Sequence, residues 1–199
     1  GLASGSENGN VNIFISNLTI NTARINFSAK YTGIVRYTVM GNTYKTSLHH
    51  VPGIIKRNKQ DLSGKFILNY GCGVGYEKVD EYFLGTGTKL YHYDPYSPIA
   101  AQRKKAPILP FQRVVCANVL NVIQLDEDID KAIISVARVA AMSNKCIAYF
   151  SVYEGKRNGV GGVTIRGYQR NEKAGAYTPI LKNYFSTVKR NKEHFVCIF

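Results

Sequence analysis

The stretch Phe66–Gly75, which reads FILNYGCGVG, decides the fold. Its first half is a short apolar run that fits a buried strand, and its second half is a glycine-rich turn. A helix is predicted next, and a second apolar run ends at Asp94. A Rossmann-like sheet binds a nucleoside in this order of elements, because glycines let the ligand approach the backbone and a carboxylate accepts its ribose hydroxyls.

The spacing of the glycines narrows the choice of ligand. The dinucleotide fingerprint G-x-G-x-x-G needs a glycine where this chain has Tyr76, and no G-x-x-x-x-G-K-S/T phosphate loop occurs. Neither pattern that binds a pyrophosphate is therefore present. Gly71, Gly73 and Gly75 follow the spacing G-x-G-x-G, which is compatible with an adenosyl ligand that has no pyrophosphate.

Length and composition limit the class of protein. At 199 residues the chain is expected to form one domain with a small addition. No apolar run approaches the roughly 20 residues that a membrane span needs, and no signal peptide is visible. The four cysteines (Cys72, Cys116, Cys146 and Cys197) form no C-x-x-C pair, which favours buried, reduced thiols, a cytoplasmic location and no metal site.

The chain is strongly basic, with 26 Lys and Arg residues against 13 Asp and Glu and a net charge of +13. This balance favours polyanionic partners such as nucleic acid, although it also serves solubility. In a late segment, Tyr168 and Gln169 stand between Arg166 and Arg170. Tyrosine beside arginine suits base stacking with phosphate contact, and it also suits an ordinary half-exposed surface. These four residues are the candidates for substrate binding.

Three regions are predicted along the chain. Residues 1–10 are rich in Gly, Ser and Asn and are expected to be disordered. Residues 11–50 alternate apolar and polar positions and contain the hairpin signal Gly41-Asn42, so they are expected to form a β-ribbon. The ribbon could cover a cofactor, grip a substrate or mediate oligomers. Residues 51–199 are expected to form an alternating α/β domain.

Within residues 51–199 the patterns predict individual elements. Strands are expected at 66–70, 113–117, 146–150 and 195–199, and helices at 54–60, 77–83 and 177–185. Asp126 is expected to cap a further helix with an acidic first turn and one apolar face. A strand near 187–188 would pair antiparallel with the final strand.

Several stretches together resemble one protein family. Residues 69–75 (NYGCGVG) are similar to its D-Y-G-C-G-x-G motif, residues 93–95 to the following D-P, and residues 114–123 to a strand followed by VLNVI. Thr164, Gly167 and Gln169 resemble its threonine–glycine–glutamine stretch. The family is the class I S-adenosylmethionine-dependent methyltransferases. Over about residues 60–199 the chain is most similar to those predicted in bacterial DNA-modification clusters, including clusters associated with DNA phosphorothioation.

The resemblance implies a fold, a cofactor and a set of site residues. The fold would be a Rossmann-like, mostly parallel sheet with an antiparallel C-terminal hairpin, and the cofactor would be S-adenosylmethionine. Asp94 would bind the ribose, while Asn118 and Val119 would lie beside the transferred methyl group or the adenine. A turn-forming Asp-Pro is the structural alternative for Asp94. For Asn118 and Asn121 the structural alternative is a helix cap and a buried hydrogen bond. The residues implied to bind the cofactor are Asn69, Tyr70, Gly71, Cys72, Gly73, Gly75, Asp94, Pro95, Asn118 and Val119.

One position departs from the family pattern. Motif I usually opens with an acid that helps to hold the methionine amino group, and this chain has Asn69. Asparagine keeps an acceptor oxygen but loses the charge that favours a cationic ligand. The D-P-P-Y type of motif and the Pro-Cys nucleophile of DNA base methylation are absent. The methyl acceptor, the catalytic base and the oligomeric state are not specified by these patterns.

Three classes of function therefore stay open. The first is an S-adenosylmethionine-dependent methyltransferase that methylates an oxygen or nitrogen atom, with nucleic acid as one possible acceptor. The second is a degenerate, non-catalytic module that binds the cofactor or nucleic acid, which Asn69 and the basic charge suggest. The third is a structural protein that assembles through its β-ribbon, because a fold does not determine a function.

Overall fold

The computed structural model describes residues 50–97, 107–164 and 167–199. All of them belong to the second of the two units of the chain, Thr38–Phe199. The predicted disordered start at 1–10 and the predicted ribbon at 11–50, except for His50, lie outside the described residues. The substrate candidate Arg166 lies outside them as well.

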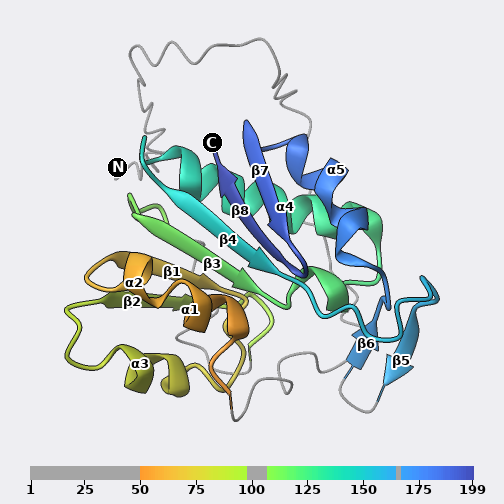
Figure 1. Cartoon of the computed structure of the whole chain (residues 1–199), viewed down its shortest axis with the longest axis horizontal. Helices are drawn as coiled ribbons and strands as arrows, with labels where there is room; N and C mark the ends of the chain where they lie inside the picture. Colours follow the sequence, from red (N-terminus) through yellow and green to blue (C-terminus); the bar gives the residue numbers. More distant parts are fainter. Residues whose placement is uncertain (1–49, 98–106, 165–166) are drawn as a thin grey trace, which may run out of the picture. The chain divides into compact units, whose positions relative to one another are not determined.

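A six-stranded sheet with the order β2-β1-β3-β4-β8-β7 forms the centre of the described part (Figure 1). β1 pairs in parallel with β2 and β3, and β3 pairs in parallel with β4. β8 is antiparallel to both β4 and β7. The predicted α/β class, with a mostly parallel sheet and a C-terminal antiparallel hairpin, is therefore confirmed. The bounds are β1 Phe66–Tyr70, β2 Lys89–Tyr93, β3 Arg113–Ala117, β4 Ile147–Ser151, β7 Thr187–Asn191 and β8 His194–Ile198.

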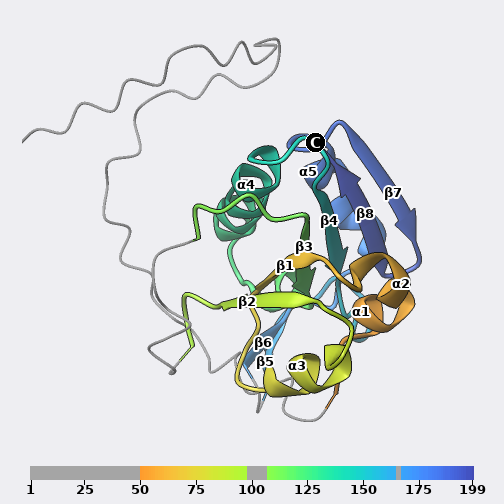
Figure 2. The same cartoon turned by 90° about the vertical axis from the view of Figure 1, so that its left-hand side faces the viewer.

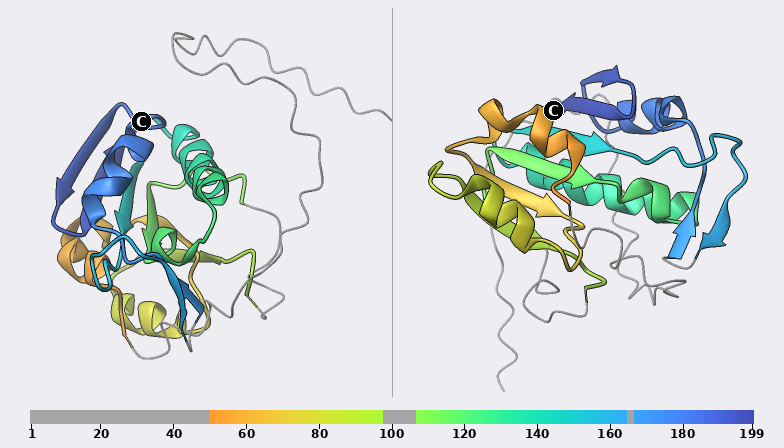
Figure 3. Two further views of the ribbon diagram at one scale, coloured as in Figure 1. Left: turned by 90° about the vertical axis from the view of Figure 1, so that its right-hand side faces the viewer. Right: turned by 60° about the horizontal axis from the view of Figure 1, so that its bottom comes forward.

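Helices cover both faces of this sheet (Figures 2 and 3). α1 (Gly53–Arg57), α2 (Lys59–Leu62) and α3 (Glu77–Phe83) pack on one face, and α4 (Asp126–Ala141) and α5 (Tyr177–Lys182) pack on the other. The inner strands serve both layers, because successive side chains of a strand point to opposite faces. Val114 and Cys116 thus join the layer of α4, while Val115 joins the layer of α1. No described helix is long and apolar enough to cross a membrane.

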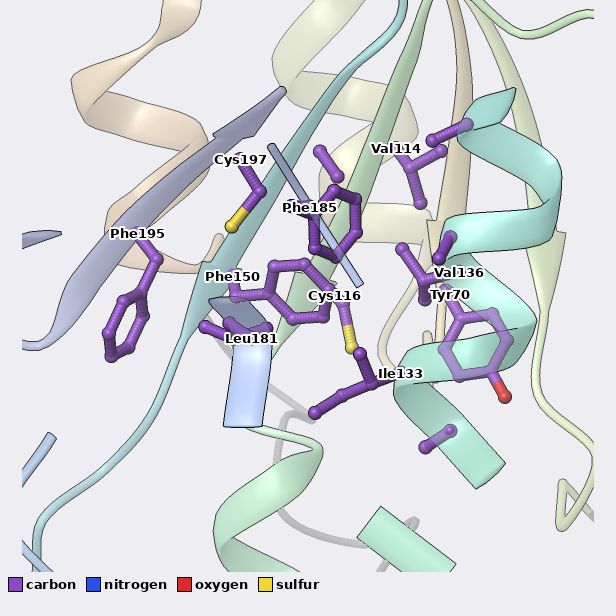
Figure 4. Packing of buried hydrophobic residues seen from close by; sticks show 14 of the residues in the cluster. Tyr70, Val114, Cys116, Ile133, Val136, Phe150, Leu181, Phe185, Phe195 and Cys197 are labelled. Carbon is purple, nitrogen blue, oxygen red and sulfur yellow. The ribbon is translucent and has the colours of Figure 1, made fainter. Parts of the chain in front are cut away.

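The larger core lies between the sheet and the helices α4 and α5 (Figure 4). Ile133 and Val136 of α4 are buried there with Cys116 and Phe150 of the neighbouring strands. The predicted apolar face of α4 is confirmed, since the residues that follow one another along it at spacings of 4, 3 and 4 are all buried (Ile129, Ile133, Val136 and Ala140). Each large apolar side chain contributes roughly 1.5–3 kcal/mol when it is fully buried. This layer therefore fixes the sheet on which the candidate site is built.

The predicted capping role of Asp126 is wrong. Leu125 occupies the N-cap position of α4, and no side chain there bonds to the backbone of the first turn. Asp126 is instead the first helical residue, and its carboxylate accepts a hydrogen bond from Arg170 Nη2 at 2.5 Å. The acidic first turn still complements the helix dipole.

All four cysteines are free and buried, as predicted. Burial raises the pKa of the Cys146 thiol to about 11 and that of Cys197 to about 12. Because the thiolate is the reactive form, these side chains behave as small apolar groups at neutral pH.

A small second sheet follows β4. It consists of β5 (Gly162–Thr164) and β6 (Gly167–Gln169), which pair antiparallel. The short helices η2 (Leu120–Val122) and η3 (Ala174–Ala176) lie on either side of this part of the chain. The β5–β6 hairpin lies at the end of the main sheet toward which β3 and β4 point (Figure 1).

Candidate nucleoside-binding site

The parallel strands β1, β2, β3 and β4 all end at one edge of the sheet, which we call the carboxyl edge. The chain passes from β1 to β2 on one side and then to β3 on the other, so the order reverses at β1. Ligands of open α/β sheets bind at the carboxyl edge beside such a reversal. The first residues after β1, β2 and β3 are Gly71, Asp94 and Asn118.

Gly71 begins the turn after β1, and its geometry excludes a side chain for two reasons. Its φ of +67° lies in the left-handed region that favours glycine. A Cβ built on it would lie only 2.3 Å from Cγ2 of Val119, which follows β3. The Gly71 N–H donates to the Tyr93 carbonyl at 2.7 Å, so the turn is also tied to the end of β2.

Asp94 connects the glycine turn to the end of β2. It is buried, and its Oδ2 accepts a hydrogen bond from the Gly73 N–H at 3.0 Å. Its Oδ1 accepts a second bond from the Tyr96 N–H at 2.9 Å, which makes the Asp-Pro turn that was the structural alternative. An ionised carboxylate has about four acceptor sites. Asp94 therefore keeps acceptor capacity for a pair of ligand hydroxyls.

Asn118 and Val119 bring the end of β3 to the same place. Asn118 adopts φ +57°, a left-handed conformation that Asn tolerates better than most residues. Its N–H donates to the Ser151 carbonyl at 2.8 Å, and the Ser151 hydroxyl donates to Asn118 Oδ1 at 3.3 Å. Asn118 is exposed. Of the predicted cofactor residues, Gly71, Gly73, Asp94 and Val119 are thus directly linked, and Asn118 adjoins them.

Asn69 makes a contact that the sequence did not reveal. It is buried, and its Nδ2 donates to Nδ1 of His92, the residue paired with it on β2, at 3.1 Å. His92 Nε2 then carries the ring proton and donates to Asp80 Oδ1 of α3 at 2.9 Å. The Tyr76 ring lies 4.7 Å from the His92 ring. Asn69 therefore joins two strands and a helix. The sequence signal that could have indicated this contact is the presence of polar residues, Asn69 and His92, near the same end of two adjacent parallel strands.

Tyr70, Cys72 and Pro95 border the same turn. The Tyr70 ring points into the α4 layer and lies 5.5 Å from the Tyr93 ring. Cys72 is buried, and burial together with the nearby Asp94 raises the pKa of its thiol. Pro95 is half-buried between Asp94 and the exposed Tyr96. Cofactor contacts by these residues stay predictions.

A polar cluster joins the end of β6 to the short helix η2 after β3 and to the loop after β4. Asn121 is buried, its Nδ2 donates to Gln169 Oε1 at 3.1 Å, and its Oδ1 accepts the Tyr153 N–H at 3.1 Å. Gln169 Nε2 donates to the Tyr153 carbonyl at 2.8 Å. This pairing confirms that Asn121 makes a buried hydrogen bond.

The guanidinium of Arg170 is held within the fold. Its Nη1 donates to the carbonyls of Ile123 and Gln124 at 3.3 and 3.0 Å, and its Nη2 pairs with Asp126 and Glu172 at 2.5 and 2.9 Å. Tyr168 packs over Gly161, where an added Cβ would lie 1.8 Å from its hydroxyl. Each of Tyr168, Gln169 and Arg170 thus makes contacts within the fold. Their contact with substrate stays a prediction.

An open hollow of about 530 Å³ lies at the opposite, amino edge of the sheet. It is lined by Lys65, Gln112, Arg113, Met142, Ser143, Asn144 and Lys145. It contains neither a glycine turn nor a carboxylate that could accept ribose hydroxyls. The chemistry therefore favours the carboxyl edge as the nucleoside site.

The structure is similar to several solved structures. An S-adenosylmethionine-dependent methyltransferase from Mesorhizobium loti is 11% identical with a TM-score of 0.49, over 73% of this chain and 96% of the other. A predicted S-adenosylmethionine-dependent methyltransferase from Listeria monocytogenes is 16% identical with a TM-score of 0.45, over 73% and 96%. A protein from Pyrococcus horikoshii is 15% identical with a TM-score of 0.43, over 72% and 87%. No family model and no curated protein matches the sequence.

Proposed function

We propose that this protein binds S-adenosylmethionine at the carboxyl edge and transfers its methyl group to a second substrate. One observation carries the proposal. The Gly73 N–H bonds to Asp94 Oδ2 at 3.0 Å, which joins the turn after β1 to the carboxylate after β2 beside the reversal of strand order. The similarity of residues 69–75 and 93–95 to methyltransferase motifs supports the choice of cofactor.

Methyl transfer places few demands on the protein. When bound, S-adenosylmethionine supplies an electrophilic methyl group, and the protein must hold the acceptor in line with it. The residues at the edge fit the donor. Gly71 and Gly73 bring no side chain of their own to the turn, and Asp94 has acceptor sites left for ribose hydroxyls. Asn118 is exposed beside the turn and could orient the acceptor. The S–C bond breaks as a C–O or C–N bond forms, and the acceptor loses a proton to solvent or to a base.

Nucleic acid is the acceptor that we favour. Tyr96 after β2 and Tyr153 after β4 are exposed at the carboxyl edge. Val160 before the β5–β6 hairpin and Val163 within it are exposed as well. Aromatic side chains exposed beside a basic surface suit stacked bases. The net charge of +13 would draw a polyanion toward the protein.

A non-catalytic cofactor-binding module is the second candidate, and Asn69 favours it. Its side-chain amide bonds to His92 and brings no negative charge to the glycine turn. Such a protein would bind the same ligand without turnover. The third class, assembly through the ribbon, concerns residues 11–50, which lie almost wholly outside the described part.

Calorimetric titration of the purified chain is the first test. We expect micromolar or tighter binding of S-adenosylmethionine and S-adenosylhomocysteine, and no binding of NAD because the pyrophosphate pattern is missing. Failure of both adenosyl ligands to bind would contradict the proposal. Transfer of a labelled methyl group to DNA or RNA then separates the enzyme from the non-catalytic module.

Asp94→Ala tests the ribose contact. We expect at least about tenfold weaker binding of S-adenosylhomocysteine, because a charged hydrogen bond is worth roughly 1.5–3 kcal/mol. The substitution also frees the Gly73 N–H, so the turn itself could change. Titration with the 2′,3′-dideoxy analogue separates the two effects. Loss of the hydroxyls should weaken binding to the wild type and leave binding to Asp94→Ala unchanged. An equal effect on both proteins would place the ribose elsewhere.

A further inference from the structure

Two segments that are far apart in the sequence form one basic surface. α1 contributes Lys56 and Arg57, and the β7–β8 hairpin contributes Lys189 and Lys192. All four side chains are exposed. Together they are called the α1–β7 basic surface below.

Direct contacts bring these segments together. Arg57 Nη2 lies 4.0 Å from Glu193 Oε1 in the turn between β7 and β8. A Cβ built on Gly53 would lie 3.7 Å from His194 Cε1, so the start of α1 packs against the start of β8. The two segments therefore share one face of the molecule.

The strand register decides which hairpin side chains face α1. Lys189 pairs with Val196, and Val196 packs in the same layer as the α1 residues Ile54 and Ile55. Paired residues of antiparallel strands point to the same face, so Lys189 faces the α1 side. The neighbouring Arg190 pairs with Phe195 and faces the α5 side, and it is not part of this surface.

One end of the α1–β7 basic surface, the turn between β7 and β8, lies at the carboxyl edge, while Lys189 lies level with the middle of β4. His194 pairs with Ser151, the last residue of β4, and the Val152 N–H donates to the Glu193 carbonyl at 3.1 Å. β8 is separated from β1 by β3 and β4. Three strand spacings of about 4.8 Å place the turn between β7 and β8 roughly 14 Å from the glycine turn after β1.

The charge of the surface is largely uncompensated. Within the part of the chain that the structure describes, Lys56, Lys189 and Lys192 form no ion pair. Glu193 is the one acid within residues 53–60 and 187–199, and Arg57 and His194 both contact it. Exposed lysines that form no ion pair are available to a polyanion.

We propose that the α1–β7 basic surface binds the phosphodiester backbone of the nucleic acid that is methylated. The assignment of this nucleic acid as the acceptor rests on the proposed function, whereas its binding does not. One strand of a duplex carries a phosphate about every 3.4 Å, so roughly four nucleotides span the 14 Å to the glycine turn. A strand held here would place a base several nucleotides away at the carboxyl edge.

The test compares two triple variants of the full chain by fluorescence anisotropy with a labelled single-stranded oligonucleotide. Lys56→Gln/Lys189→Gln/Lys192→Gln removes three charges from the surface. Lys89→Gln/Lys145→Gln/Lys182→Gln removes three charges elsewhere, at the amino edge and on α5, which are also exposed and form no ion pair among the described residues. Urea unfolding checks that both variants are folded.

We expect the surface variant to bind about tenfold or more weakly, and its slope of log K against log salt to be smaller by about 2, because each phosphate contact in a single strand contributes about 0.7. The control variant should stay within about threefold of wild type. Equal losses in both variants would show a general charge effect and overturn the proposal. Binding to phosphatidylserine vesicles that depends on these lysines, without such dependence for the oligonucleotide, would also overturn it.

Titration with S-adenosylhomocysteine separates this proposal from the proposed function. The surface variant should bind that ligand as the wild type does, because none of its three lysines lies in the turns after β1, β2 or β3. If no form of the chain binds S-adenosylhomocysteine, yet only the surface variant loses the oligonucleotide, the methyltransferase proposal fails and the nucleic-acid surface stands.

Discussion

Gly71 combines a backbone constraint and a packing constraint that can be measured separately. Gly71→Ala should lower the free energy of unfolding by about 2–5 kcal/mol, because a left-handed alanine costs roughly 1–2 kcal/mol and overpacking roughly 1–3 kcal/mol more. Gly85 has φ +76° and no atom within 4 Å of an added Cβ. Gly85→Ala should therefore lower the free energy of unfolding only by the cost of a left-handed alanine, roughly 1–2 kcal/mol.

Urea unfolding of both alanine variants checks this expectation. Val119→Ala combined with Gly71→Ala should recover part of the packing loss, because Val119 Cγ2 is the atom in conflict. Equal destabilisation by Gly71→Ala and Gly85→Ala would show that Val119 does not constrain the turn.

Asn69→Asp should strengthen the binding of S-adenosylmethionine. A carboxylate would add attraction for the ammonium group of the ligand, and two charges 4 Å apart in water interact by about 1 kcal/mol, or roughly fivefold in affinity. 5′-Methylthioadenosine lacks the amino acid part and should gain nothing. Unchanged affinity for both ligands, measured by titration, would mean that position 69 acts only through His92.

Arg170 is the connection between the loop after β3, the start of α4 and the segment after β6. Its side chain is only 12% exposed and pairs with two acids and two carbonyls. Arg170→Lys keeps the charge but loses the planar fork. We expect a loss of about 2–3 kcal/mol in urea unfolding, since a hydrogen bond to a charged group contributes about 1.5–3 kcal/mol.

Arg157→Lys is the matched control, because Arg157 is 67% exposed and forms one ion pair with Glu154. An exposed pair contributes at most about 1 kcal/mol. If Arg170→Lys is as stable as Arg157→Lys, the arginine is not a structural connection, and its predicted contact with substrate becomes the better account of it.

Elements set by local patterns could be predicted closely. The helix Glu77–Phe83 and the strand Arg113–Ala117 have the expected bounds. The expected helix at 54–60 is divided at Asn58, whose Nδ2 donates to the Ile54 carbonyl at 2.7 Å. A side chain that bonds to its own backbone competes with continuation of the helix. The expected helix at 177–185 ends at Lys182.

Side-chain partners across the sheet could not be predicted in the same way. The glycine turn and Asp94 are each visible in a short window of sequence. Asn69 and His92 are 23 positions apart, and Asn121 and Gln169 are 48 apart. Such pairs depend on strand order and on a register that a one-residue slip would change. The backbone turns of the candidate site could therefore be predicted from sequence, whereas the side-chain contacts that support them could not.

Stability should fall with acid in two stages, because His194, and at lower pH Asp61 and Glu193, have lowered pKa values in the fold and so bind protons more readily in the unfolded chain. Burial lowers the pKa of His194, so stability should decline as the pH drops below about 6.5. The hydrogen bond from Arg113 holds the pKa of Asp61 below 3.8, so a second decline should begin near pH 4. In each window the unfolded state takes up the proton first, so the native state loses stability.

Urea unfolding at pH 7.5, 5 and 3 measures both stages. His194→Gln should reduce the loss of stability between pH 7.5 and 5 and leave the loss between pH 5 and 3 unchanged. Asp61→Asn should reduce the loss between pH 5 and 3 and leave the loss between pH 7.5 and 5 unchanged. A wild-type stability that is constant between pH 7.5 and 5 would contradict the account of His194.

The β5–β6 hairpin is closed at its base by bonds that do not depend on its length. The Gly159 N–H donates to the Asn171 carbonyl at 2.9 Å, and the Lys156 N–H donates to Asn171 Oδ1 at 3.1 Å. Residues 155–160 are therefore held by Asn171, while Val160 and Val163 are exposed to solvent. Doubling the length of such a loop costs only about 0.6 kcal/mol. Evolution or a protein engineer can thus insert a new recognition segment here, beside the site, without refolding the sheet.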